Sequence, residues 1–214
     1  MITDRDKKIF DFLFRVKYAT VDQILKYMEM TKRATYVRLA ILVRRGYIES
    51  HAVLGTNMKL YANGHMVRID HVIDSYKRAV TIQLMELEHH LKVTDVFMDF
   101  LDKGIKADDI YTEREIMANK IGIDTKKKRL CKVPDLAIKR ADGKLIAIEV
   151  ELSRKNNERL ESVMKNYDMN TNYYAVRYLC INGAVKRKVE RAVESTHLTY
   201  VIVYTLDEFT IDLL

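Results

Sequence analysis

The segment VPDLAIKRADGKLIAIEVELSRK, Val133 to Lys155, contains two apolar runs separated by the turn-forming residues 141–143. Its alternation of side chains predicts two paired strands of one hairpin. Pairing the strands places Asp135 of the first run and Glu149 and Glu151 of the second on one face. Clustered carboxylates must be solvated, protonated or bound to a cation, because an uncompensated buried charge is costly. The segment therefore predicts either a solvated strand face or a cation site.

The cation favoured by this donor set is a hard divalent ion. Mg²⁺ or Mn²⁺ is the usual partner of an oxygen-only cluster, so Asp135, Glu149 and Glu151 are candidate metal ligands. Such an ion could position water against a phosphodiester. Lys155, four residues beyond Glu151, could reach into the same site. Asp135, Glu149, Glu151 and Lys155 are therefore the catalytic candidates if the site is active.

The patterns on either side of this hairpin extend it into a layered domain. A short helix capped by Thr112 and Glu115 is predicted before it, and two helices alternate with two strands after it. We therefore expect an α+β protein in which residues 105–214 form an α/β or α+β layered domain with a mixed central sheet.

The positive charge of the chain is concentrated in its first third. Residues 1–70 hold 13 Lys/Arg and 7 Asp/Glu, a net charge of +6, whereas residues 71–214 hold 24 and 23, a net charge of +1. A basic module followed by a nearly neutral body indicates a polyanionic partner, with nucleic acid first.

Three helices and a hairpin are predicted within that basic module. Thr3/Asp4, Thr20 with Gln23, and Thr31 are the expected helix N-caps, and Gly46 is expected to end the third helix. Gly-Thr-Asn at residues 55–57 is expected to join two short strands.

This order of elements resembles the winged helix-turn-helix family. The resemblance implies that residues 1–70 bind double-stranded DNA, with the third helix in the major groove and the hairpin against the backbone. It assigns the DNA contacts to the outward side of the third helix and to the hairpin, namely Thr31, Lys32, Arg33, Thr35, Tyr36, Arg38 and Lys59.

Residues 71–104 follow a helical pattern almost without a break, from about Ile73 to Lys103. Such a helix could connect two domains, or could pair with its copy in a homodimer that contacts two half-sites. The pattern alone leaves both arrangements open, and it also allows two helices broken near residues 71–76.

The Pro134-Asp135 and Glu149-x pattern resembles the PD-(D/E)xK nuclease superfamily. Glu151 stands where that superfamily has lysine, so the pattern allows both an active and an altered nuclease site. The whole chain resembles the replication-relaxation family of plasmid and other mobile-element proteins, which join a winged helix to a PD-(D/E)xK-like domain. That resemblance also marks Glu115 and Tyr167, and implies a role in replication, relaxation or transcriptional control, with replication or transfer proteins as further partners.

Three functional classes therefore stay open. The first is a DNA-binding protein, expected to be a homodimer, and the second is a Mg²⁺- or Mn²⁺-dependent endonuclease. The third is a protein-interaction module. The N-terminus lacks the apolar core of a signal peptide and no apolar run reaches about 20 residues, so we expect a cytoplasmic protein without a membrane partner.

Overall fold

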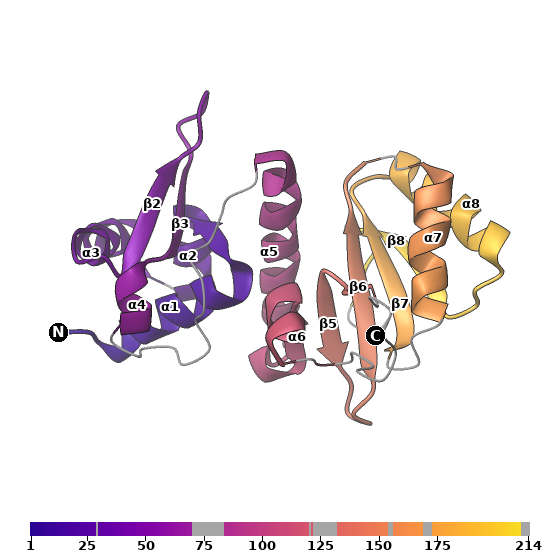
Figure 1. The fold of residues 1–214 in the computed structure, drawn as a ribbon, viewed down its shortest axis with the longest axis horizontal. Helices are drawn as coiled ribbons and strands as arrows, with labels where there is room; N and C mark the ends of the chain where they lie inside the picture. Colours follow the sequence, from indigo (N-terminus) through magenta and orange to yellow (C-terminus); the bar gives the residue numbers. More distant parts are fainter. Residues whose placement is uncertain are drawn as a thin grey trace. The chain divides into compact units, whose positions relative to one another are not determined.

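Two units make up the chain in the computed structural model, Met1–Met98 and Asp99–Leu214 (Figure 1). The structure describes residues 1–28, 30–69, 84–119, 121, 132–153, 156–168 and 173–210. Each unit combines helices with a β-sheet, so the predicted α+β class is confirmed. Within the described ranges, no helix has the length and apolar character needed to cross a membrane.

The first unit contains the three helices and the hairpin that the sequence predicts. Its elements are α1 (Asp4–Val16), β1 (Tyr18–Thr20), α2 (Val21–Met28), α3 (Lys32–Arg44), β2 (Ile48–Ala52), β3 (Lys59–Asn63) and α4 (His65–Ile69). β3 pairs antiparallel with both β2 and β1, so the sheet order is β1-β3-β2. The sequence analysis did not predict β1, which is only three residues long.

The helix boundaries follow from the predicted caps. Thr3 and Asp6 form a capping box on α1, with the Asp6 carboxylate accepting from the Thr3 amide at 2.7 Å. Thr20 and Gln23 exchange the corresponding bonds at the start of α2, at 3.1 and 3.2 Å. Gly46 follows the C-cap of α3 with φ = +76°, a conformation that favours glycine.

The predicted middle helix is α5 (Leu87–Asp102), preceded by a single 3₁₀ turn, η1 (Leu84–Glu86). The part of the prediction that covers residues 73–83 lies outside the described residues. The portion of α5 in the first unit packs within the chain. Gln23 Nε2 donates to the Leu91 carbonyl at 3.0 Å and to Asp95 Oδ1 at 2.7 Å. Phe97 packs against Phe12 of α1.

The second unit is built on a five-stranded sheet. After the end of α5 come η2 (Ala107–Asp109), β4 (Ile110–Thr112), α6 (Glu113–Asn119), β5 (Leu136–Lys139), β6 (Leu145–Glu151), α7 (Asn157–Asp168), β7 (Tyr173–Cys180), α8 (Gly183–Thr196) and β8 (Val201–Thr205). The strand order is β4-β5-β6-β7-β8. β4 to β6 pair antiparallel and β6 to β8 pair parallel, which is the mixed sheet that the sequence predicts.

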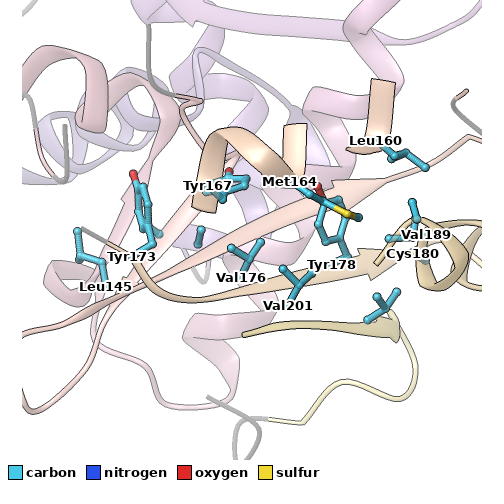
Figure 2. Close-up of a cluster of buried hydrophobic side chains, with 14 of the residues drawn as sticks. Leu145, Leu160, Met164, Tyr167, Tyr173, Val176, Tyr178, Cys180, Val189 and Val201 are labelled. Carbon is cyan, nitrogen blue, oxygen red and sulfur yellow. The ribbon is translucent and has the colours of Figure 1, made fainter. Parts of the chain in front are cut away.

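One face of this sheet carries a core formed with α7 and α8 (Figures 1 and 2). Ala147 of β6 and Tyr178 of β7 lie in this cluster with Met164 of α7 and Val189 of α8. Glu149 and Glu151 alternate with Ile148 and Val150 along β6, so they extend from the same face as Ala147. The two glutamates are therefore on the helix-covered side of the sheet.

Candidate functional site

α3 separates a buried side from a basic outer side. Leu39 and Leu42 are almost completely buried. The outermost line of the helix runs through Arg33, Val37, Ala40 and Arg44, all exposed and spaced by three or four residues. Lys32 and Tyr36 flank this line and are also exposed. We call these residues, with Ala34, the outer face of α3.

Two residues predicted to contact DNA do not belong to that face. Thr35 is fully buried, and its hydroxyl donates to the Thr31 carbonyl at 3.1 Å, so its outward placement was wrong. The pattern failed there because threonine is compatible with either side of a helix, and its hydroxyl can bond the preceding turn. Arg38 is held by Asp6, with its Nε donating to Asp6 Oδ1 at 2.6 Å and its NH2 group to Oδ2.

The Arg38–Asp6 pair shifts the pKa of both of its side chains. Burial opposes ionisation of Asp6, but the hydrogen bonds from Arg38 and Thr3 outweigh it and lower the pKa of the Asp6 carboxyl. The hydrogen bond to Asp6 in turn raises the pKa of Arg38. Arg38 therefore ties α3 to the start of α1.

The cations of the outer face, in contrast, have no carboxylate partner within the described part of the chain. This applies to Lys32, Arg33 and Arg44. α3 itself contains no acidic residue. The three side chains are thus available to an anionic ligand.

Two hollows border the outer face of α3. The first has a volume of about 720 Å³ and lies between the starts of α1 and α3, with Arg5, Arg33 and Val37 in its lining. The second, of about 500 Å³, lies between α2 and the hairpin. Its lining includes Tyr36 and Lys59, the hairpin residue that the sequence analysis predicted to contact DNA.

The second candidate site is a row of polar side chains across three strands of the second unit. Leu136 of β5 is paired with Ile148 of β6, and continuing this register by one residue sets Asp135 opposite Glu149. Glu149 is paired in turn with Tyr178 of β7. Glu149 and Glu151 are buried, which excludes the solvated strand face that the sequence left open.

Each described carboxylate of the row has its own hydrogen-bond donor. Asp135 Oδ2 accepts from the Val150 amide at 2.8 Å. Glu149 Oε1 accepts from the Tyr167 hydroxyl, and Glu151 Oε1 accepts from the Ser153 amide at 3.2 Å. Within the described ranges, no three His, Cys, Asp or Glu side chains form a group that could hold a metal ion.

Lys132 is a member of this site that the sequence analysis missed. Its Nζ lies 3.4 Å from Glu149 Oε1, the same oxygen that Tyr167 approaches. Burial disfavours the ammonium form, but Glu149, Asp135 and Glu113 together outweigh it, so the pKa of Lys132 is raised. A positive charge therefore stands close to Glu149 of β6 and to Asp135, the residue just before β5.

The pKa values of two tyrosines at the same site are raised by burial and by the negative charge of the carboxylates. Burial, followed by the charge of Glu149, raises the pKa of Tyr167. Burial and the charges of Glu149, Glu151 and Asp135 raise the pKa of Tyr178. The Tyr178 hydroxyl is buried without a hydrogen-bond partner among the described residues. Tyr178 and Tyr167 both lie in the core cluster of Figure 2.

Of the two other predicted site residues, Glu115 is among the described residues and Lys155 is not. Glu115 forms a capping box with Thr112, accepting from its amide at 2.9 Å and from its hydroxyl at 3.0 Å. Its carboxylate therefore stabilises the start of α6. Lys155, the predicted catalytic lysine, lies outside the described residues.

Asp135 and Glu149 supply two carboxylate groups at facing positions of the hairpin, and carboxylate oxygen is the donor type that a hard divalent cation prefers. A metal held there would act as a Lewis acid and supply an activated water molecule. Lys132 contributes a positive charge at the same place and therefore competes with any such ion.

Comparisons of the chain with models of protein families, with curated proteins and with solved structures find no match. What the protein binds therefore has to be inferred from its own residues. The two candidate sites differ in the exposure of their side chains and in whether those side chains already have partners. The outer face of α3 is exposed and basic, whereas Glu149 and Glu151 are buried, Asp135 is half-buried, and all three accept a hydrogen bond.

Proposed function

We propose that the protein binds duplex DNA through the outer face of α3. The observation that carries this proposal is that the cations of α3 have two different environments. Arg38 is used in an internal ion pair, while Lys32, Arg33 and Arg44 extend from the exposed side. Duplex DNA presents a dense row of phosphates, and neutralising them with Lys and Arg is the main source of affinity.

The arrangement of the first unit supports this mode of binding. Three helices, α1 to α3, precede the β2–β3 hairpin, and this is the order on which the resemblance to the winged helix-turn-helix family rests. Arg33 and Arg44 are eleven residues apart, or about 16 Å along a helix. An α-helix with its side chains is about 10–12 Å in diameter, so α3 fits the major groove of B-DNA, which is about 12 Å wide. The two hollows beside α3 would then accept the flanking backbones.

The biological setting is proposed from the family resemblance. We place the protein with the mobile-element proteins that act in replication, relaxation or transcriptional control, as a homodimer that contacts two half-sites. In this proposal the second unit is the body of the protein and a surface for replication or transfer partners.

The test is duplex binding by a variant with Lys32→Ala, Arg33→Ala and Arg44→Ala, measured by fluorescence anisotropy on a random 30-bp duplex. The matched control carries Lys106→Ala, Lys139→Ala and Arg187→Ala, three exposed cations of the second unit, and loses the same charge. We expect the α3 variant to bind at least tenfold more weakly than the control variant. Equal binding by the two variants would overturn the proposal.

A second candidate function is metal-dependent cleavage of DNA by the second unit. The observation that favours it is the row of Asp135 and Glu149 with Lys132 beside them. Carboxylates could hold Mg²⁺ or Mn²⁺, and an ammonium group could stabilise the charge that develops on a phosphodiester.

Nicking of supercoiled plasmid in Mn²⁺ tests this candidate. Glu149→Gln keeps an acceptor for the Tyr167 hydroxyl but removes the charge, so it should abolish nicking while the protein stays folded. Glu158→Gln, an exposed change on α7, is the control and should retain activity. Absence of nicking by the unaltered protein, or nicking that survives Glu149→Gln, would rule the endonuclease out.

A further inference from the structure

The centre of the outer face of α3 is apolar. Val37 is 57% exposed and lies between Arg33 and Arg44 on the outermost line of the helix. Ala34 and Ala40, on either side of it, are also exposed. The most prominent part of the helix is thus a short apolar strip, with cations at both ends.

This strip is not required by the core of the first unit. Leu39 and Leu42 provide the buried contacts of α3, and they extend from the opposite side. The two alanines are small, so a ligand can come close to the helix backbone along this line. Val37 also lines the hollow between α1 and α3, together with Arg5 and Arg33.

The charge around the strip identifies its occupant. α3 has no acidic residue, and Lys32, Arg33 and Arg44 surround the apolar centre. The ligand must therefore be strongly anionic at its edges and apolar where it meets Val37. The major groove of duplex DNA has this character, because phosphates line both sides and the C5-methyl group of thymine is the apolar feature of its floor.

We infer that Val37, with Ala34 and Ala40, contacts thymine methyl groups and gives the protein a preference for sites with thymine under the centre of α3. The inference rests on the proposed DNA binding and adds a base preference to it. Arg33 and Arg44 fix the helix on the duplex, and the apolar strip supplies discrimination between bases.

The test removes the methyl groups without changing base pairing. A random 20-bp duplex library is enriched on the protein, and the enriched pool is then copied with dTTP or with dUTP. Uracil pairs like thymine and lacks only the C5-methyl group. We expect the unaltered protein to bind the thymine pool roughly three- to tenfold more tightly, as expected for a few apolar groups removed from water.

Val37→Ala should bind both pools with nearly equal affinity, because it removes the side chain that meets the methyl group. Met117→Ala is the matched control, since Met117 is an apolar residue of α6 in the second unit and is 56% exposed. This control should keep the preference for thymine. Circular dichroism of each variant verifies that its fold is retained.

The outcomes separate the inference from the proposal beneath it. Equal binding of the two pools by the unaltered protein overturns the thymine preference and leaves DNA binding intact. Failure to bind any duplex at low salt overturns both. If Val37→Ala changes only the oligomeric state in sedimentation, the strip is a protein contact and the inference is wrong.

Discussion

Arg38 of α3 and Asp6 of α1 form a two-pronged ion pair, with Arg38 Nε donating to Asp6 Oδ1 at 2.6 Å and its NH2 group donating to Oδ2. Asp6 is fully buried and also caps α1 through Thr3. The pair therefore joins the candidate DNA-binding helix to the helix beneath it. One basic residue of α3 is structural, while its neighbours on the outer face remain available.

Replacing Arg38 should destabilise the protein. Arg38→Met removes the cation and leaves the buried Asp6 carboxylate with fewer donors, which should cost about 2 kcal/mol in the free energy of unfolding. Arg33→Met is the matched control, because Arg33 is exposed, and it should change stability by less than about 0.5 kcal/mol. Urea denaturation measures both changes. Equal stability of the two variants would mean that the ion pair contributes nothing.

The same pair predicts a stability change in acid. The folded protein lowers the pKa of Asp6 below its ordinary value of 3.8, so the stabilisation is complete above that value and is lost as the pH falls through the lowered pKa. Asp6→Asn lacks the titrating group. The difference in unfolding free energy between the unaltered protein and Asp6→Asn should therefore shrink below about pH 3.8. A difference that stays constant down to pH 2 would contradict this account.

Local sequence signals predicted most elements of the first unit. Thr20 with Gln23 and the left-handed Gly46 set helix boundaries through contacts within a few residues, which a sequence shows directly. Arg38 was misplaced because its position depends on a distant group. A helical pattern does not show that Asp6, 32 residues earlier, takes the Arg38 guanidinium.

At the carboxylate row, too, local contacts could be predicted from the sequence and distant contacts could not. The hairpin that pairs Asp135 with Glu149 follows from alternation and a turn, and could be predicted. Lys132 lies just before Pro134-Asp135, where its sequence position gave no sign of a charged partner. Its contact is with Glu149, which comes 17 residues later in the chain. Only the fold brings the two residues together.

Lys132 should control how the carboxylate row responds to metal. Lys132→Met keeps the length of the side chain and removes its charge, so Asp135 and Glu149 lose their nearby cation. We expect Mn²⁺ to raise the melting temperature of this variant by several degrees more than that of the unaltered protein. Lys139→Met, an exposed change on β5, is the control and should respond to Mn²⁺ as the unaltered protein does. An equal response in all three proteins would contradict competition between Lys132 and a divalent ion.

Tyr167 and Tyr178 provide a contrast within one site. The Tyr167 hydroxyl donates to Glu149, so Tyr167→Phe should destabilise the protein by about 1–2 kcal/mol. The Tyr178 hydroxyl is buried without a hydrogen-bond partner in the described part of the chain, so Tyr178→Phe should be neutral or stabilising. Urea denaturation of the two variants compares them. A greater loss of unfolding free energy in Tyr178→Phe than in Tyr167→Phe would reveal a bound group that uses the Tyr178 hydroxyl.

The central claim is that the outer face of α3 contacts duplex DNA, and site-specific crosslinking tests it most directly. Cysteine is introduced by Ala40→Cys at the middle of this face, in a background with Cys131→Ser and Cys180→Ala, and is labelled with a photoactivated aryl azide. Met117→Cys on α6, where Met117 is 56% exposed, is the control. The account predicts crosslinks from position 40 to bases of a bound duplex and none from position 117. Equal crosslinking from the two positions, or none from position 40 while the duplex is bound, would contradict it.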